Sequence, residues 1–466
     1  MNVAEKVKLI KQGLLSSEKL CEECITNIER NDKEGKGLNA VAMICDDWRA
    51  QARALDQNPD KDRSNQYLYG IPVLVKDNIE VKGTPNTAGS YVLRDNISKD
   101  DSFLVKCLRD QGAVILGKCN LSEFAYWMSE DGMPSGYSSL SGQVIHPYNP
   151  SFDPSGSSSG SAVAVAARYC DLAVGTETDG SLMSPAISNG IVSIKPTLGL
   201  ISRNGILPLS HVQDSAGPMA NSVEDCVVLL QSMAVLDPSD PAFKNAEVNN
   251  YFKELKKDLS GKRIGAFTME GYEHNAEYLD YLKDLIEENH GEVVEIELKK
   301  AAVDEYECLF YEFKEDINAY LARQDCKARC LKDIIRMNEE NKEKCLRYGQ
   351  SLLIKSQEKP SLEDEEYQKL RQKISGEAER ILNETIDENK LSCLVTICHS
   401  AAFNLAAVSG ACSMTLPARE INEVNYDPLS FYLLGKKNKE GELIRLAYTL
   451  EKSMNLVVKP SWLKDR

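Results

Sequence analysis

The sequence has little positive charge and no long apolar run, and each shortage excludes a class of function. Its 466 residues contain 55 lysines and arginines against 71 aspartates and glutamates, for a net charge of −16. Clustered basic side chains bind nucleic acid, so direct nucleic-acid binding is not expected. No apolar stretch approaches the roughly 20 residues of a membrane-spanning helix, and no apolar signal segment follows Met1. A membrane is therefore not an expected partner.

The fourteen cysteines do not form the dense pattern of a small disulfide-bonded protein. Two close pairs, Cys21 with Cys24 and Cys326 with Cys330, lie at helical spacing without a second pair of ligands nearby. A zinc site needs about four ligands, so it is the less favoured alternative. The cysteines are predicted to be reduced thiols on helices, and no bound metal is expected. This favours a cytoplasmic protein.

Histidine, the usual general base near neutral pH, is also scarce. The chain has five histidines, and none of them lies in the serine-containing turns described below. They are His146, His211, His274, His290 and His399. We expect the histidines to be structural and the catalytic base to be another residue.

Short apolar strands alternate with amphipathic helices along most of the chain. Strands are predicted over residues 68–75, 113–116, 172–174, 262–267, 293–296 and 394–397. Helices are predicted over residues 3–30 (in two parts), 41–55, 103–111, 161–168, 275–289 and 441–455. Ser17 is expected to cap the second helix of the first segment. The alternation predicts an α/β sheet covered by helices on both faces.

The segment 301–389 has a different character, because it is strongly charged and poor in glycine. Apolar and aromatic residues recur in it at helical spacing: Tyr306, Leu309, Phe310, Phe313 and Tyr320. The pattern predicts a solvent-facing helical elaboration rather than a disordered linker.

Two serine-containing turns carry the candidate chemistry. The first, residues 155–161, follows Pro154 and precedes an apolar helix, which disfavours a flexible linker. It also lacks the Gly-Lys-Ser/Thr ending of a phosphate loop and the G-x-G-x-x-G pattern. The second turn, residues 178–181, follows a predicted strand, and its successive N–H groups can form a nest for an oxyanion. Ser181 could attack a carbonyl there if a base lies nearby.

Lys76 is the candidate base. A free lysine has a pKa near ~10.4, and burial can lower it by about 3–5 units. The apolar residues 71–75 offer such burial, and Asp77 should point to the opposite face of the strand. A strand-end lysine that reaches solvent is the alternative that the residues alone leave open.

Several stretches in fixed order closely resemble the amidase signature family. They are residues 70–78, 87–90, 117–124, 155–161, 175–181, 194–200 and 213–219. The resemblance covers about residues 4–235 and, more weakly, 262–296 and 391–460. It implies the amidase signature fold, a mixed and mostly parallel β-sheet of many strands with helices on both faces. We expect one domain over 1–466, with its catalytic core, here called the signature core, at 60–235 and the helical elaboration at 301–389.

The family's Ser–cis-Ser–Lys triad can be carried over by motif position. The resemblance implies Ser181 as nucleophile, Ser157 as the relay after a cis peptide bond, and Lys76 as base. Ser158 or Ser159 is expected to orient Ser157. The backbone N–H groups expected to hold the oxyanion are those of Thr178, Asp179, Gly180 and Ser181.

The implied activity is cofactor-free hydrolysis of a carboxamide through a seryl acyl-enzyme, with release of ammonia or an amine. Residues 175–181 resemble the peptide amidase-like branch, which acts on peptide C-terminal amides. The glutamine-hydrolysing subunits of tRNA-dependent amidotransferases usually have glycine where this chain has Asp179 and arginine where it has Met183. Such a subunit, which would need a partner protein, and a non-catalytic binding protein stay as alternatives. Arg419, where relatives usually have glycine, and the loop 419–428 leave the substrate's acyl group undefined.

Overall fold

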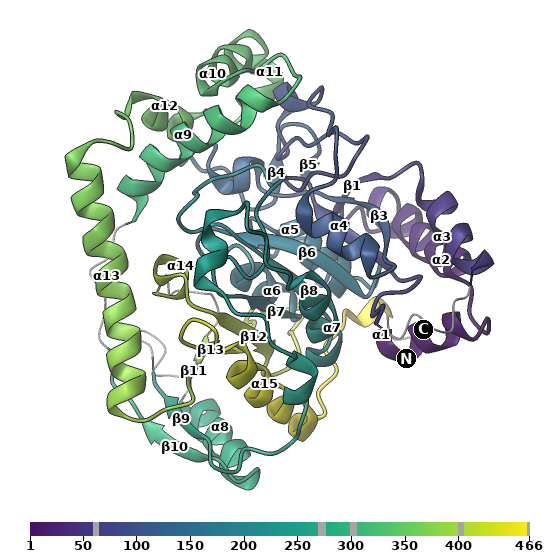
Figure 1. Cartoon of the computed structure of the whole chain (residues 1–466). Helices are drawn as coiled ribbons and strands as arrows, with labels where there is room; N and C mark the ends of the chain where they lie inside the picture. The colour runs from purple at the N-terminus through teal and green to yellow at the C-terminus, as the bar shows by residue number, and fades with distance from the viewer. Residues whose placement is uncertain (59–64, 269–275, 299–304, 399–404, 464–466) are drawn as a thin grey trace.

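One large mixed sheet forms the centre of the computed structural model, which describes residues 1–58, 65–268, 276–298, 305–398 and 405–463 (Figure 1). Its eleven strands within these ranges run in the order β1-β3-β2-β6-β8-β7-β12-β13-β11-β9-β10. They are β1 (Val41–Ile44), β2 (Pro72–Lys76), β3 (Val114–Cys119), β6 (Leu172–Glu177), β7 (Val192–Lys195), β8 (Ser215–Ala220), β9 (Arg263–Ala266), β10 (Glu292–Glu295), β11 (Cys393–Cys398), β12 (Ser413–Pro417) and β13 (Ser430–Leu434). A small separate hairpin joins β4 (Tyr137–Ser138) and β5 (Gly142–Gln143).

The predicted α/β fold with a large mixed sheet is confirmed. Its parallel pairings lie in two blocks, β3-β2-β6 and β11-β9-β10. The pairings between the blocks, and that of β1 with β3, are antiparallel. The sheet therefore has more antiparallel pairings than the expected mostly parallel arrangement.

Helices cover both faces of the sheet, as predicted. Along β2, Val73 and Val75 pack on one face and Leu74 packs on the other, the alternation that a strand dictates. The first face is covered by α1 (Val3–Lys11), α4 (Phe103–Asp110), α7 (Val223–Met233), α8 (Ala276–Glu288) and α15 (Glu440–Met454). The other is covered by α2 (Ser17–Ile28), α3 (Trp48–Gln57), α5 (Ser159–Ala166), α6 (Met183–Asn189) and α14 (Leu405–Ser409).

The charged segment is helical, as predicted, over its described part from residue 305. It contains α9 (Tyr306–Arg323), α10 (Leu331–Glu340), α11 (Lys342–Cys345), α12 (Ser351–Glu358) and α13 (Glu365–Glu388). We call these five helices the helical elaboration; residues 301–304 lie outside the described residues. Figure 1 shows α9–α12 at one end of the molecule and the long α13 along its side.

The helical elaboration is packed on the protein rather than only facing solvent. Leu309 and Phe313 of α9 are buried in a cluster with Phe124 and Trp127 from the signature core. The aromatic rings of Phe124 and Phe313 meet edge to face, with centroids 6.1 Å apart. Tyr306, in contrast, is 52% exposed.

Two local predictions are wrong. Residues 41–44 form β1 rather than the start of a helix, because they pair with β3 at the edge of the sheet. The N-cap of α2 is Ser16, whose hydroxyl accepts the N–H of Lys19. The Ser17 hydroxyl instead donates to the carbonyl of Gly70, 2.8 Å away.

The fourteen cysteines are all free thiols, as predicted, and only Cys326 and Cys330 are partly exposed. Burial raises the pKa of the Cys119 thiol to about 12 and that of Cys308 to about 11. In the described ranges, no helix is both long and apolar enough to cross a membrane.

Candidate active site

The sheet topology brings the candidate residues together. Strands β2 and β6 are parallel neighbours, so their C-terminal ends lie at one edge. Lys76 is the last residue of β2, and the turn 178–181 follows β6 directly. Ser157 stands just before α5, which packs on the same face as Leu74. Three segments far apart in sequence therefore meet at one point.

Lys76 is fully buried and is surrounded by oxygen atoms. Its Nζ lies 2.7 Å from Ser157 Oγ and 3.0 Å from Ser158 Oγ. It also lies 3.0 Å from the hydroxyl and 3.2 Å from the carbonyl oxygen of Thr176. Burial lowers the pKa of Lys76 to about 7, although the charges of Asp214 and Glu177 oppose that shift. The predicted burial is confirmed, and the solvent-reaching alternative is excluded.

Asp77 does not pair with Lys76, as its place on the strand predicted. Its Oδ1 lies 2.7 Å from Nζ of Lys118, which is also fully buried. Lys118 donates to the carbonyl of Pro85 and the side-chain oxygen of Asn86. Lys118 is thus paired with a carboxylate, whereas Lys76 has only uncharged partners in hydrogen-bond range.

The peptide bond between Gly156 and Ser157 is cis, as the resemblance implied. The Ser158 hydroxyl donates to the carbonyl of Thr176 and accepts from Lys76. The Ser159 hydroxyl donates to the carbonyl of Ser155. Ser158 thus touches Lys76 directly, whereas neither serine forms a side-chain hydrogen bond with Ser157 among the contacts of the described residues.

The turn 178–181 is held on both sides. One carboxylate oxygen of Glu177, the residue before the turn, accepts the N–H groups of Leu182 and Met183, which follow the turn, at 2.7 and 3.0 Å. Within the turn, the Thr178 hydroxyl donates to Asp214 Oδ1 at 2.5 Å. Gly180 has a φ of +72°, a conformation that side-chain-bearing residues rarely adopt.

Ser181 is 7% exposed, and its carbonyl accepts the N–H of Ser158 at 3.2 Å. Within the described residues, no hydrogen bond joins its hydroxyl to that of Ser157. Such catalytic contacts are often long before substrate binds. The two turns are thus joined through their backbones, with Ser181 beside the Ser157–Lys76 pair.

Comparison with known proteins identifies the family. The sequence profile of the family named Amidase matches residues 19–415. The chain belongs to the amidase family. A probable amidase of Arabidopsis thaliana is 36% identical over 445 residues, which cover 91% of this chain and 84% of that protein.

Solved structures of amidases have the same architecture. Native peptide amidase from Stenotrophomonas maltophilia superposes with a TM-score of 0.93 at 34% identity, over 100% of this chain and 99% of that one. An amidase family protein from Bacillus anthracis gives 0.91 at 37% identity, over 97% and 90%. A glutamyl-tRNA(Gln) amidotransferase subunit from Lawsonia intracellularis is 39% identical, over only 54% of this chain and 51% of that protein.

Four residues at this amidase site received no role from the sequence: Asn78, Thr176, Glu177 and Asp214. The Thr176 hydroxyl accepts from both Lys76 and Asn78, each at 3.0 Å. Asp214 accepts the N–H groups of Leu209 and Ser210, and burial raises its pKa to about 6. All four lie inside the stretches that carry the resemblance, but their contacts appear only in the structure.

His146 and His211 of this amidase lie in other networks. His146 faces the carbonyl of Ser188, and burial lowers its pKa to about 4. His211 pairs with Asp316 at 2.9 Å. His274 and His399 lie outside the described residues. Within the described ranges, no group of three or more acidic, histidine or cysteine side chains could hold a metal ion.

Arg419, the departure in the C-terminal part, is held by Tyr278 and Asp427. Its guanidinium donates to the Tyr278 hydroxyl at 2.8 Å and to the carbonyl of Asp427 at 2.7 Å. These contacts involve neither Lys76 nor the serine turns.

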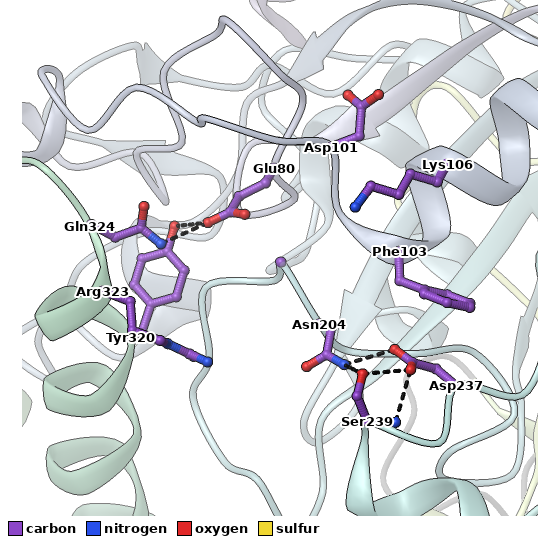
Figure 2. A pocket seen from close by; sticks show the side chains of 11 residues that line it. Glu80, Asp101, Phe103, Lys106, Asn204, Asp237, Ser239, Tyr320, Arg323 and Gln324 are labelled. Carbon is purple, nitrogen blue, oxygen red and sulfur yellow. Dashed lines mark hydrogen bonds between the residues drawn. The ribbon is translucent and has the colours of Figure 1, made fainter.

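A cavity of about 500 Å³ lies between the signature core and the end of α9 (Figure 2). On one wall, Glu80 accepts from the Tyr320 hydroxyl and the Gln324 amide, at 2.8 and 2.9 Å. On the other, Asp237 accepts from Asn204 and Ser239. None of Lys76, Ser157 and Ser181 lines it, so it is separate from the serine site.

Proposed function

We propose that this chain hydrolyses carboxamides through an acyl-enzyme on Ser181, with Ser157 as proton relay and Lys76 as base. One observation carries the proposal: a fully buried lysine, whose pKa is lowered to about 7, lies 2.7 Å from the Ser157 hydroxyl. Serine needs a neighbouring base to act as a nucleophile, and lysine serves when burial makes it neutral.

The count of protons around Lys76 supports the relay. A neutral amine has two protons and one lone pair, yet Nζ faces four oxygens. The Thr176 carbonyl can only accept, and the Ser158 hydroxyl already donates to that carbonyl. The Thr176 hydroxyl accepts from Asn78 and keeps its own proton, but it lies 3.0 Å from Nζ, farther than the Ser157 hydroxyl at 2.7 Å. Ser157 is therefore the hydroxyl best placed to donate to the neutral amine.

The reaction would then proceed in two stages. Lys76 accepts the Ser157 proton while Ser157 takes that of Ser181, whose Oγ attacks the amide carbonyl. The N–H groups of Thr178, Asp179, Gly180 and Ser181 stabilise the oxyanion. The relay returns the proton to the leaving nitrogen, and the C–N bond breaks. Water then attacks the acyl-enzyme by the same relay and restores Ser181.

We propose a peptide C-terminal amide or a small amide as the substrate, cleaved without a partner protein. The match to peptide amidase over 100% of this chain supports that choice. The sequence of residues 175–181 resembles that branch. The free cysteines support the cytoplasm as the compartment. Small amides and peptide amides differ in the size of the acyl group, so the two classes should differ in their rates of cleavage.

A glutamine-hydrolysing amidotransferase subunit is the second candidate, because the one from Lawsonia intracellularis is 39% identical over 259 residues. That match covers about half of either chain, which counts against it. It predicts glutamine hydrolysis that depends on a co-purifying partner. A non-catalytic binding protein is the third, and the retained Lys76, Ser157 and Ser181 count against it.

The test is ammonia release from a panel of peptide amides, small amides and glutamine. We expect release from an amide by the purified chain alone and its loss in Ser181→Ala. Ser184→Ala, three residues along and half-buried in α6, is the matched control and should keep full activity. No ammonia from any amide would refute the proposed function. Failure of a fluorophosphonate to label Ser181 as well would favour the binding protein.

A further inference from the structure

A buried polar chain connects the helical elaboration to the oxyanion turn. Its first part is the loop 209–214, which leads into β8. The side-chain amide of Gln213 donates to the backbone carbonyl of Thr178 at 3.1 Å. Gln213 is 1% exposed, so water does not substitute for this contact. The loop therefore holds the turn by its backbone as well as through the bond from Thr178 to Asp214.

The second part is an ion pair between two helices of the elaboration. Arg371 of α13 donates from Nε to Glu312 of α9 at 2.7 Å, and its Nη2 lies 2.6 Å from the same oxygen. The two side chains are 9% and 0% exposed. Tyr367 donates to that oxygen of Glu312, and Ser210 donates to the other. Arg371 Nη1 donates to Gln213 Oε1 at 2.6 Å, which completes the connection.

The chemistry of the three groups fixes their orientation. A guanidinium can only donate, so its partner on Gln213 has to be the amide oxygen. The amide nitrogen of Gln213 then points to the Thr178 carbonyl. Without Arg371 the amide could turn over, and its oxygen would face another oxygen. The arginine thus sets which end of the glutamine meets the turn.

The orientation of the Thr178 carbonyl determines the orientation of a proposed oxyanion donor. It belongs to the same planar peptide unit as the N–H of Asp179, and the two groups point in opposite directions. A hydrogen bond that fixes the carbonyl therefore fixes the direction of that N–H. This N–H is one of the proposed oxyanion donors.

We propose that Arg371, acting through Gln213, is a positioning residue for the oxyanion turn, with Glu312 holding the arginine in place. The inference rests on the proposed role of the turn 178–181. It gives the helical elaboration a part in the chemistry, although none of its residues needs to touch substrate. An ion pair that only joined α9 to α13 would not need its third donor directed at Gln213.

The test compares Arg371→Met with Arg380→Met in the same helix. Arg380 is exposed and, among the residues that the structure describes, pairs only with Glu384, so its variant should match the wild type. We expect Arg371→Met to lower kcat by about 10- to 100-fold, the range for a slightly misplaced catalytic group, with KM changing much less. Arg371→Lys, which can still donate to Gln213, should recover part of the loss. Thermal melting would establish that each variant is folded.

A double-mutant cycle tests the route. Gln213→Met leaves the Glu312–Arg371 pair in place but removes the donor to Thr178. If the arginine acts through the glutamine, the double variant should lose no more kcat than Gln213→Met alone. A folded Arg371→Met with unchanged kcat, or losses that simply multiply, would overturn the inference. If Arg371→Met does not fold, an unchanged kcat in Gln213→Met would do so, and a lowered one would support it.

The rate of Ser181 labelling by a fluorophosphonate separates this inference from the proposed function, because labelling needs no amide. If the wild type is labelled but cleaves no amide, the proposed function fails and the labelling rates still test the relay. Slower labelling in Arg371→Met and Gln213→Met than in Arg380→Met is the expected result. Equal rates in all three would overturn it.

Discussion

The signature core buries Lys76 and the helical elaboration buries Arg371, and these two basic side chains have different partners. In the core, the hydrogen-bond partners of Lys76 are two serines and a threonine, with no carboxylate among them. In the elaboration, Arg371 is in direct contact with the carboxylate of Glu312. A lysine among uncharged oxygens can give up its proton, whereas an arginine keeps its charge. The comparison separates a base that has to titrate from a link that has to stay fixed.

The largest effect should come from the titrating side chain. Lys76→Met removes the only base within reach of Ser157 among the described residues, so kcat/KM at pH 7 should fall by about 10⁴-fold, the upper end for loss of a general base. Ammonia release by purified protein measures it. Lys373→Met, an exposed lysine of α13, should leave the rate unchanged. Equal effects of the two substitutions would show that Lys76 is not the base.

The stability of the protein should also report the titration of Lys76. Its pKa falls from 10.5 to about 7 on folding, so below pH 7 burial of the charge opposes folding by about 5 kcal/mol. That penalty declines between pH 7 and 10.5 as the unfolded state alone binds the proton. The free energy of unfolding of the wild type should therefore rise across this window relative to Lys76→Met. A pH-independent difference between the two, as expected for Lys373→Met, would contradict it.

The packing of the elaboration on the core gives the next effect. Phe313 is fully buried against Phe124, so Phe313→Ala should lower the free energy of unfolding by about 3–5 kcal/mol. Ile354→Ala in α12 is the control, since that side chain is 41% exposed. Denaturant unfolding measures both. We propose that residues 1–466 form one domain, so the loss should appear in a single transition; two separated transitions would refute that proposal.

The smallest effect concerns the pH profile of the rate. The negative charge of Asp214 raises the pKa of Lys76, so Asp214→Asn should move the rising limb of the profile to lower pH. The amide can retain the local contacts: its oxygen can accept from Leu209 and Ser210 while its nitrogen donates to the Thr178 hydroxyl. The pH dependence of kcat/KM measures the shift. A limb displaced to higher pH would contradict the assigned charge effect.

Much of the site could be predicted because it lies where sequence motifs and sheet geometry agree. An apolar strand ending in lysine and a strand followed by a glycine turn become parallel neighbours, so their ends meet. The approach of Lys76 to the turn 178–181 follows from this, and strand alternation places Asp77 on the opposite face. Their catalytic roles remain proposals.

Other features depended on contacts that one sequence does not reveal. Residues 41–44 have four apolar side chains in a row, which suit a helix start or a short edge strand equally well. Ser16 and Ser17 are both suitable caps, but the Ser17 hydroxyl donates to the carbonyl of Gly70, so Ser16 is the cap. Arg371 stands among many charged residues of α13, and only the fold shows that it is the one directed inward.

Alkylation of the buried thiols can show which region of the molecule opens first. A cysteine reacts as the thiolate, so a buried thiol with a raised pKa is alkylated only when the chain around it opens. Cys119 and Cys226 lie in the core, and Cys308 and Cys345 lie in the elaboration. If the two regions open together, all four should be trapped at one rate. If the elaboration lifts away by itself, its two thiols will be trapped first, and the mass of the alkylated fragments will show it.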